Sequence, residues 1–456
     1  MAAGRKRVVL GVLGCLALLF VGAIVMFVFT VAPLGTRYVA KRICSGVFVA
    51  GRAPESVWVG ELHDGNFGYP PRFSWEVDRE AQAVTARWNG LASQTVRFRL
   101  GLGCTPDSHA QNEMIPAEGL TAEQLASYQE PWPWPEETHS EGPLDEVLAS
   151  AFDDPAAGTR AVVIVQDGKL VGERYADGFD RDTPLHGWSM NKSILHALIG
   201  TQVLAGHMSL GQNHLFDEWE GTPRSEVTLE QMLQMAPGLE WSEEYTNPFD
   251  DTIQMLFGAD EAARGALEKP LAYPPGSHWN YSSGTSNMLS LLLRRALAEE
   301  GEDYLGYPQR ALFSPLGMKT SVLEPDATGT FVASSFGFAS ALDWARFGQL
   351  YLDDGLVLGE RVLPAGWLEQ ACTPTPESGG QYGGHFWLRV GEDALTRPSP
   401  LPDDACHAAG HEGQFVTIVP SERTVIVRLG LTPDRSAWHQ EDFAKSVLDA
   451  LSADRG

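Results

Sequence analysis

The segment Ser189-x-x-Lys192 pairs a serine with a lysine at a spacing that suits nucleophilic catalysis. A serine hydroxyl is a weak nucleophile and needs an adjacent base. Three residues apart on a helix, the two side chains lie on one face, and the lysine can take the serine proton if burial and neighbouring cations lower its pKa. The apolar residues 194–199 are suited to burying such a helix. Because so short a pattern recurs by chance, it needs support from elsewhere in the chain.

A second candidate is Tyr281, which follows a Pro-Pro-Gly turn at residues 274–276 and precedes an apolar stretch predicted to be helical. A tyrosine held near a lysine can shuttle protons. Taken alone, the fragment is more typical of a tyrosine on a surface loop. The similar Tyr-Thr-Asn triplet at residues 245–247 lies among acidic residues and lacks a following apolar helix, so we interpret Tyr245 as part of a loop.

The third candidate is His411-Glu412-Gly413-Gln414, in which Gly410 and Gly413 bracket a histidine just before a predicted strand. Glycine at a strand edge lets backbone amides approach a substrate closely, and such amides can form an oxyanion hole. The histidine alone is equally typical of a solvated loop. The remaining histidines show no metal-ligand spacing, and we expect neither a metal ion nor a cofactor.

These candidates must be positioned by a domain in which strand and helix periodicities alternate. The apolar residues 161–165 and the mixed stretch 169–175 flank Asp167-Gly168 and predict a hairpin with a two-residue turn. The other predicted elements are helices over residues 193–204, 287–297 and 441–451 and paired strands over residues 415–419 and 424–429. Strands at both ends of the domain, with helices between them, indicate an α+β domain whose sheet draws strands from both ends.

Changes in composition divide the rest of the chain. Residues 43–130 contain short alternating stretches separated by turn residues, which predicts a small β-rich region. Residues 131–139 are rich in proline and tryptophan, which indicates a stiff linker. The catalytic domain is then expected at residues 140–456.

The first 42 residues carry six basic residues and no acidic residue. Within them, the uncharged apolar run over residues 8–33 exceeds the ~20 residues that span a bilayer, and a cleavable signal peptide usually has a shorter apolar core. We therefore expect residues 1–42 to form an uncleaved single-pass membrane anchor. Basic residues favour the cytoplasmic side, and they flank the run at both ends. Because the N-terminal flank is shorter and also carries the α-amino group, we expect it inside and the catalytic domain outside the cytoplasm, in a periplasmic or extracellular location.

Overall charge and cysteine content limit the partners and the compartment. The net charge is −26, and a body this acidic repels phosphate backbones, which argues against nucleic-acid binding. Four cysteines lie beyond the apolar run and could form two disulfides outside the cytosol. Four cysteines allow three pairings, and the sequence does not choose among them. Our first expectation is Cys44–Cys104, since both lie in the N-terminal region, followed by Cys372–Cys406, with buried free thiols as the alternative.

In this order and at these separations, the three candidate segments resemble the serine β-lactamase and penicillin-binding-protein-like superfamily, of which Ser-x-x-Lys is a signature. The likeness is to its class C-like branch, which includes D,D-carboxypeptidases, esterases and 6-aminohexanoate-dimer hydrolases. Further stretches that are similar to this branch lie at residues 227–241, 329–335, 343–348 and 351–355. The resemblance covers residues 144–453 and implies an antiparallel sheet flanked by helices, plus a helical subdomain.

The resemblance also implies catalytic roles. Ser189 would be the nucleophile, and Lys192 would be the base that takes its proton. Tyr281 would assist proton transfer to the leaving group and, later, from the deacylating water. The reaction would be acyl transfer to Ser189 followed by hydrolysis.

By the same resemblance, the backbone amides of Ser189 and Gln414 would form the oxyanion hole, and Ser283, His411 and Gly413 would contribute to substrate binding. Two of these residues depart from the family pattern. Ser283 replaces the asparagine of the usual Tyr-x-Asn, and His411 replaces a lysine that normally helps to hold a substrate carboxylate. Because histidine is a weaker, pH-dependent cation, we expect poor hydrolysis of penicillins.

The sequence therefore predicts a serine hydrolase of small ester or linear amide substrates that works through a Ser189 acyl-enzyme. Two alternatives remain open. One is a cell-wall D,D-peptidase or β-lactamase, and the other is a catalytically silent binding module tethered to a membrane. The sequence leaves the substrate and the oligomeric state undetermined.

Overall fold

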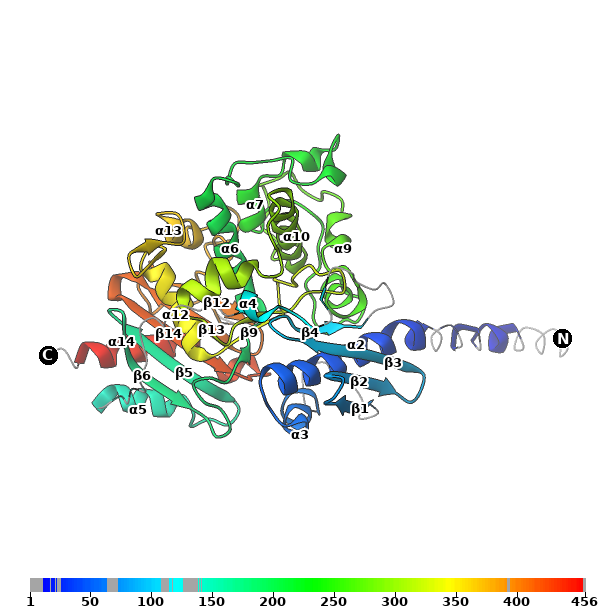
Figure 1. Cartoon of the computed structure of the whole chain (residues 1–456), viewed down its shortest axis with the longest axis horizontal. Coiled ribbons are helices and arrows are strands. Elements are labelled where there is room, and N and C mark those ends of the chain that lie inside the picture. The colour runs from blue at the N-terminus through cyan, green and yellow to red at the C-terminus, as the bar shows by residue number, and fades with distance from the viewer. Residues whose placement is uncertain are drawn as a thin grey trace, which may run out of the picture.

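The structure is a computed structural model of the whole chain, in which a small N-terminal sheet lies beside a larger α+β domain (Figure 1). It describes residues 11–453 apart from residues 17, 21, 23–25, 64–72, 108–114, 117, 126–137, 139, 141 and 392–393. The linker predicted over residues 131–139 lies outside the described residues except for residue 138, and so does part of the apolar run at residues 8–33.

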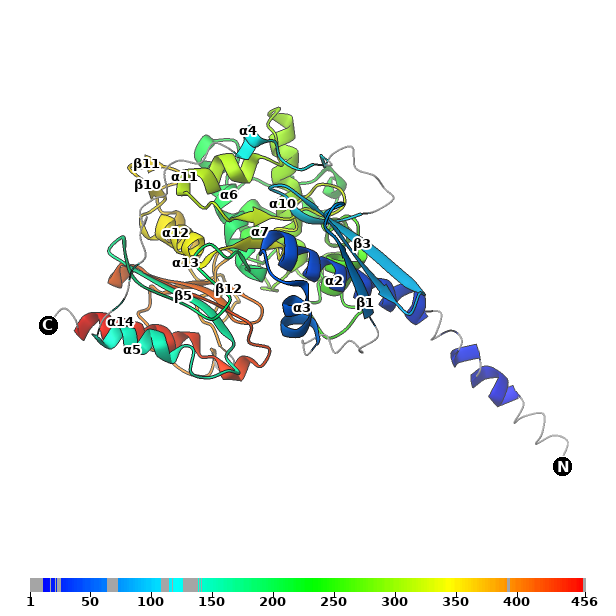
Figure 2. The same ribbon diagram turned by 60° about the horizontal axis from the view of Figure 1, so that its bottom comes forward.

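The N-terminal sheet is a four-stranded antiparallel meander that packs on α2 (Ala32–Cys44). Alternate side chains of a strand point to one face, and Val84, Ala86 and Val96 use that face to share a buried core with Tyr38 and Ile43 of the helix. Figure 2 shows α2 running alongside this sheet. The strands, in their order across the sheet, are β1 (Phe73–Asp78), β2 (Ala83–Trp88), β3 (Ala92–Arg99) and β4 (Gly103–Pro106).

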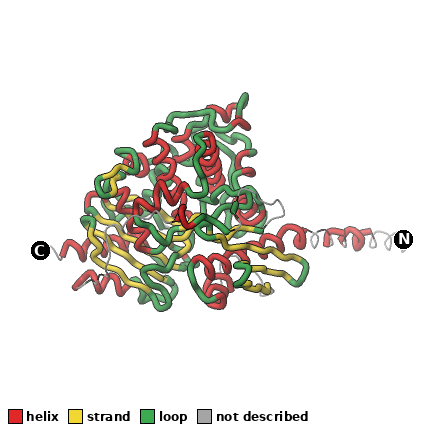
Figure 3. The backbone as a smooth tube through the Cα atoms, viewed as in Figure 1, coloured by secondary structure: helices red, strands yellow, loops and turns green. Residues whose placement is uncertain are grey.

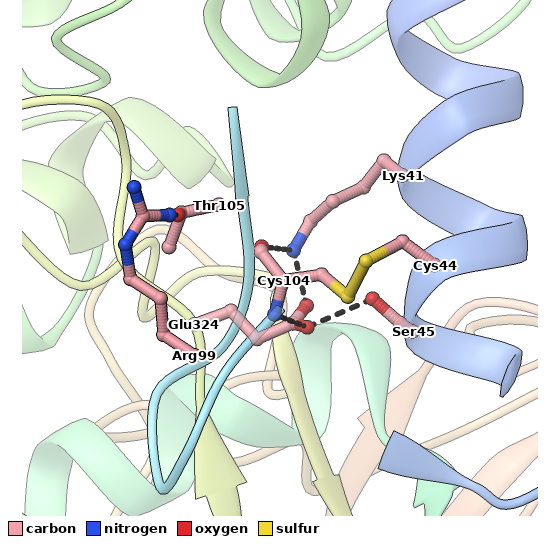
Figure 4. Close-up of a disulfide and its surroundings, with 7 residues drawn as sticks. All are labelled: Lys41, Cys44, Ser45, Arg99, Cys104, Thr105 and Glu324. Carbon is pink, nitrogen blue, oxygen red and sulfur yellow. Dashed lines mark hydrogen bonds and ion pairs between the residues drawn. A yellow bond between two sulfur atoms is a disulfide. The ribbon is translucent and has the colours of Figure 1, made fainter. Parts of the chain in front are cut away.

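A disulfide between Cys44 and Cys104 joins the C-terminal end of α2 to β4 (Figure 4). Beside it, the buried Lys41 donates to the carbonyl oxygen of Cys104 and pairs with the carboxylate of Glu324. Glu324 also accepts a hydrogen bond from the backbone N–H of Cys104 at 2.7 Å. Because Glu324 belongs to the catalytic domain, these contacts fix α2 and β4 against that domain.

The membrane anchor predicted over residues 1–42 is not found in the part of this segment that the structure describes. Among the described residues, no helix is long and apolar enough to cross a bilayer. The end of the apolar run instead enters α2, whose side chains are buried against protein. Arg37, for example, donates to the carbonyl oxygen of Ala259 at 2.8 Å and pairs with Asp260 at 2.9 Å. The prediction that an anchor holds the catalytic domain outside the cytoplasm is therefore wrong.

The catalytic domain is built on a five-stranded antiparallel sheet with the order β12-β13-β14-β5-β6. Its central pairing is between β14 and β5, so the sheet takes strands from both ends of the domain, as predicted. The hairpin around Asp167-Gly168 is confirmed, with both turn residues at positive φ. The strands are β5 (Thr159–Gln166), β6 (Lys169–Tyr175), β12 (Cys406–Gly410), β13 (Gln414–Val419) and β14 (Thr424–Gly430).

Helices cover both faces of this sheet (Figure 3). In β5, Val162 and Ile164 join one hydrophobic cluster, whereas Val163 and Val165 join another, because successive side chains of a strand point to opposite faces. The first cluster includes residues of α5 (Gly142–Ser150) and α14 (Gln440–Ala453), and the second includes residues of α12 (Ala341–Leu352). A strand buried on both faces accounts for the nearly continuous apolar sequence of β5.

A helical subdomain is centred on α6 (Asn191–Ala205) and α10 (Ser283–Glu299), which pack together and confirm two predicted helices. The N-cap residue of α10 is Ser282, whose side chain accepts a hydrogen bond from Thr285 N at 2.9 Å. The shorter described helices are α3 (Pro54–Val57), α4 (Ala122–Leu125), α7 (Leu229–Leu233), α8 (Asp251–Ile253), α9 (Arg264–Leu267), α11 (Ser314–Leu316) and α13 (Trp367–Cys372). The shorter strands are β7 (Leu185–His186), β8 (Val322–Leu323), β9 (Gly337–Ala339), β10 (Leu356–Val357) and β11 (Glu360–Arg361).

A second disulfide joins Cys372, the last residue of α13, to Cys406, the first residue of β12. Together with Cys44–Cys104, it confirms the two expected pairings over the alternative of free thiols.

Candidate active site

Ser189 lies in a short 3-10 turn, Trp188–Met190, at the start of α6. The backbone before it is strained, because Trp188 has a φ of +48°, a left-handed conformation that costs a non-glycine residue about 1–3 kcal/mol. The carbonyl oxygen of Trp188 accepts a hydrogen bond from Asn191 Nδ2 at 2.7 Å, and its indole donates to Glu412 Oε2 at 3.2 Å. These contacts hold Ser189 at a bend in the chain, on the wall of a cavity.

Lys192 follows one helical turn later, and its ammonium group meets the Ser189 hydroxyl. The Nζ atom lies 3.0 Å from Ser189 Oγ, 3.0 Å from Ser283 Oγ and 3.0 Å from the carbonyl oxygen of Ser334. The lysine is only 1% exposed, and this burial lowers its pKa to about 8, against the opposing effect of the Glu243 charge. A lysine with this pKa loses its proton near neutral pH and can then accept the proton of Ser189.

Glu243 organises the far side of this hydrogen-bond network. Its carboxylate accepts from the hydroxyl of Ser283 and, at 2.9 Å, from the backbone N–H of the same residue at the start of α10. Reasoning from the sequence missed this role, because nothing local distinguishes Glu243 from the neighbouring Glu244. Further donors to the Glu243 carboxylate are Trp241 Nε1 at 2.7 Å, the Tyr245 hydroxyl at 2.7 Å and Thr252 Oγ1 at 2.8 Å.

Tyr281 lies over the lysine, with Lys192 Nζ 4.8 Å from the centroid of its ring. Trp387 packs beside it at a centroid separation of 5.1 Å. Burial and the charge of Glu243 raise the pKa of the Tyr281 phenol, and hydrogen bonding to Ser189 and Trp387 offsets this only in part. The phenol therefore keeps its proton at neutral pH and is suited to donating or relaying one.

Two residues differ from their sequence-based interpretation. Tyr245, interpreted as an ordinary loop residue, lines the cavity and stacks on His411 at a centroid separation of 5.3 Å. His411 was expected to be a weak cation, but burial lowers its pKa to about 3, and the charges of Arg435 and Arg42 act in the same direction. Its imidazole is therefore uncharged at neutral pH.

Residues 411–413 form the turn between β12 and β13, and Gln414 is the first residue of β13. Gly413 has a φ of +81°, and a Cβ atom there would lie 2.4 Å from a guanidinium nitrogen of Arg428, so only glycine fits. The Gln414 side chain donates to the carbonyl oxygens of Glu412 at 3.0 Å and Gly430 at 2.7 Å, and accepts from Gly430 N at 3.0 Å. This side chain braces the turn against β14, so only the backbone of Gln414 is suited to binding substrate.

The candidate residues meet at a cavity of about 550 Å³, a size that suits a small ligand. Ser189, Tyr281, His411 and Gly413 line it, whereas Lys192 is buried behind Ser189. Ser283 is likewise buried and contacts Lys192 rather than the cavity, so its predicted part in substrate binding is indirect. Other aromatic and charged lining residues are Tyr245, Trp387, Phe415 and Trp438, and Glu243, Glu244, Glu412, Arg389 and Arg435.

The similarity to known proteins lies in the catalytic domain. Residues 145–440 match the family model described as beta-lactamase, so the chain belongs to the β-lactamase family, within the class C β-lactamase-like serine hydrolases. A curated relative, the 6-aminohexanoate-dimer hydrolase of Paenarthrobacter ureafaciens, is 25% identical over an alignment of 321 residues, and the match covers 64% of this chain and 77% of the relative. The chain is thus a hydrolase of the esterase or amidase type.

Two solved structures share the fold. One is a Bacillus anthracis protein provisionally assigned as a 6-aminohexanoate-dimer hydrolase, with a TM-score of 0.55 and 22% identity. The match covers 70% of this chain and 87% of the Bacillus anthracis chain. The other is a family VIII carboxylesterase, with a TM-score of 0.55 and 14% identity. The match covers 70% of this chain and 99% of the carboxylesterase chain. These likenesses support the predicted β-lactamase- and penicillin-binding-protein-like α+β fold.

Proposed function

We propose that this enzyme hydrolyses ester or linear amide bonds of small substrates through an acyl-enzyme on Ser189. The observation that carries the proposal is the distance of 3.0 Å between Lys192 Nζ and Ser189 Oγ, combined with the burial that lowers the pKa of Lys192 to about 8. This pairing of a base with a hydroxyl on a cavity wall argues against a catalytically silent binding module.

In acylation, neutral Lys192 takes the Ser189 proton as Oγ attacks the carbonyl carbon of the substrate. The backbone amides of Ser189 and Gln414 stabilise the oxyanion that forms. Tyr281 gives its proton to the leaving alcohol or amine as the carbon–oxygen or carbon–nitrogen bond breaks, and protonated Lys192 restores the Tyr281 proton. In deacylation, water attacks the Ser189 ester while Lys192 takes its proton through the Tyr281 hydroxyl. Ser189 Oγ then leaves with that proton, and the carboxylic acid is released.

The charge of the site favours esters and linear amides over penicillins. His411 stands where the family pattern has a lysine, and its uncharged ring offers no cation to a penicillin carboxylate. The curated relative is named for a linear amide dimer, and one structural neighbour is a carboxylesterase. Both names agree with the substrate class that the site favours.

One observation favours the second candidate function, a D,D-peptidase or β-lactamase. Arg435 is exposed on the cavity wall, and its cation could pair with a substrate carboxylate. We expect this to be a minor activity, because Arg435 lies on the loop after β14 and not on the strand edge that holds His411. Hydrolysis of nitrocefin or of a D-Ala-D-Ala peptide at rates above those of simple esters would favour the second candidate.

Labelling with a fluorophosphonate tests the proposal. We expect the probe to bind covalently to Ser189 and the protein to hydrolyse p-nitrophenyl esters, because both reactions need the activated hydroxyl. Peptide mass spectrometry locates the label, and S189A should lose both label and turnover. S277A, at an exposed serine outside the cavity, serves as the matched control and should keep both. A wild-type protein that takes no label and cleaves no ester contradicts the proposal.

A further inference from the structure

Arg42 reaches the catalytic site from α2, a helix that lies outside the residues matched by the family model. Its buried guanidinium contacts His186 Nδ1 and donates to Glu61 Oε2 at 2.6 Å. The Cζ atom lies 4.9 Å from the ring centroid of Trp188, and Nη2 lies 3.9 Å from Glu412 Oε2. One side chain therefore touches both the residue before Ser189 and the turn before Gln414.

These two segments also contact each other directly. A Cβ atom at Gly410 would lie 2.2 Å from the carbonyl oxygen of Gly187, so the two backbones pack without side chains between them. The Trp188 indole donates to Glu412 Oε2 at 3.2 Å. Both of these residues have positive φ, +48° for Trp188 and +60° for Glu412. Strained conformations of this kind persist only when surrounding contacts hold them, and Arg42 supplies such contacts to both.

The position of Arg42 is itself fixed by its neighbours on α2. Lys41 pairs with Glu324, and the Cys44–Cys104 disulfide lies one turn further along the helix (Figure 4). The charge of Arg42 is balanced chiefly by Glu61. Burial alone would raise the pKa of the Glu61 carboxyl, but the adjacent arginines outweigh burial and lower it to about 2. Glu61 is therefore ionised at neutral pH and holds Arg42 in place.

We propose that Arg42 is a positioning residue, which sets the backbone amides of Ser189 and Gln414 at the spacing that an oxyanion requires. The proposal depends on the function proposed above. The N–H of Ser189 belongs to the peptide that follows Trp188, and the N–H of Gln414 lies two residues after Glu412, so fixing these two residues fixes both donors. A misplacement of about 1 Å in a catalytic site can cost ~100-fold in rate. The N-terminal region would thereby complete a site whose catalytic residues all lie in the catalytic domain.

R42Q tests the proposal in the full chain. We expect kcat to fall about 10- to 100-fold, because oxyanion donors act on the transition state, while KM changes less than about twofold. Rates are expressed per site titrated by the fluorophosphonate. The inhibition constant of a phenylboronic acid, whose tetrahedral adduct carries an anionic oxygen, should rise by the same factor as kcat/KM falls. If Arg42 had a purely structural role, R42Q would have fewer titratable sites. Its kcat/KM per titrated site and its boronate inhibition constant would then equal those of wild type.

R52Q is the matched control. Arg52 pairs with Glu61, as Arg42 does, and stacks on Phe179, 5.3 Å from its ring centroid. No contact of Arg52 with Trp188 or Glu412 is found among the described residues. We expect R52Q to retain wild-type kcat and boronate inhibition within about twofold, because it removes a Glu61 partner and leaves the two turns untouched. An equal loss in R42Q and R52Q would overturn the proposal.

Two further measurements test the positioning role of Arg42. R42K retains a cation beside Glu61 but lacks the planar group over Trp188, so it should fold and still lose several-fold in kcat. Hydrogen exchange of peptides over residues 186–192 and 410–416 should be faster in R42Q than in wild type or R52Q, whether or not any variant turns over substrate. Unchanged exchange, or failure of both Arg42 variants to fold, would overturn the positioning role. A different outcome would refute the proposed function alone. In that outcome R42Q exchanges faster than wild type, but the wild-type protein shows neither esterase activity nor label.

Discussion

At the residue scale, the proposed chemistry depends on where a single proton resides. Lys192 is suited to be a base because burial disfavours its charged form, and its Nζ lies within hydrogen-bond distance of Ser189 Oγ. The pKa of Tyr281 is shifted in the opposite direction, since burial raises it and keeps the proton on the phenol. A base that is free near its working pH and a phenol that keeps its proton until a strongly basic leaving group takes it are the pair that acyl transfer requires.

The pH dependence of kcat/KM follows from this arrangement. Only neutral Lys192 can take the Ser189 proton, so the rate should rise with pH through about 8 and reach a plateau near pH 9. At pH 7 we expect about a tenth of the plateau rate. His411, with its pKa near 3, should add no step between pH 5 and 9. The measurement is the initial rate of ester hydrolysis at low substrate, and a profile that stays flat from pH 6 to 9 would contradict the assignment of Lys192.

At the scale of elements, the site is where three segments converge. The turn that opens α6 carries Ser189, the first turn of α10 carries Ser283, and the loop before α8 carries Glu243. Glu243 joins the last two by accepting from both the hydroxyl and the backbone N–H of Ser283. Since Ser283 Oγ is also 3.0 Å from Lys192 Nζ, the carboxylate orients the lysine through one intermediate hydroxyl.

E243Q should therefore alter both kinetics and stability. The Glu243 charge raises the pKa of Lys192, so its removal should move the rise in kcat/KM to lower pH. An amide has one acceptor oxygen where the carboxylate has two, and we expect the free energy of unfolding to fall by about 2–4 kcal/mol. The two effects are measured by pH–rate profiles and by urea denaturation. Glu240, a nearby exposed acid outside the cavity, provides the control, since E240Q should change neither. An unshifted profile in a folded E243Q protein would show that Glu243 does not act on Lys192.

At the scale of the whole molecule, the N-terminal sheet and the catalytic domain are tied together by buried polar contacts. Lys41 of α2 pairs with Glu324, and Glu61 pairs with Arg160 of β5 at 3.0 Å. Lys41 and Glu324 are 3% and 0% exposed, so the loss of either partner would leave an uncompensated buried charge. The Cys44–Cys104 disulfide fixes the helix that presents Lys41, and so stabilises the whole arrangement.

Removing that disulfide should destabilise the protein. The bond joins residues 60 positions apart, and loss of a native disulfide typically costs about 2–5 kcal/mol through the entropy of the unfolded chain. We expect the C44A/C104A double variant to unfold at lower urea concentration than wild type. The C372A/C406A double variant, whose bond joins residues 34 positions apart, should lose a similar amount. If reductant and these substitutions leave the unfolding midpoint unchanged, the bonds do not stabilise the native state.

Local pattern was enough to predict the helices over residues 193–204 and 287–297, the Asp167-Gly168 hairpin and the strands flanking residues 420–423, because periodicity and turn chemistry are properties of neighbouring residues. The same reasoning failed for the apolar run at residues 8–33. Hydropathy counts residue types, and it cannot show that the end of the run is buried against protein in α2. It also missed Glu243 and Tyr245, whose importance depends on contacts with α10 and with the turn after β12.

By itself, the sequence determined the family and the order of its motifs, since a serine, a lysine and a tyrosine at recognisable spacings are local chemistry. Only the tertiary structure decided the protonation states of the residues in the site. Burial lowers the pKa of Lys192 and leaves His411 uncharged, and burial is a property of the folded chain. Only the tertiary structure, too, brought Arg42 against Trp188 and Glu412, because residues so far apart in the chain meet only when the hydrophobic core forms.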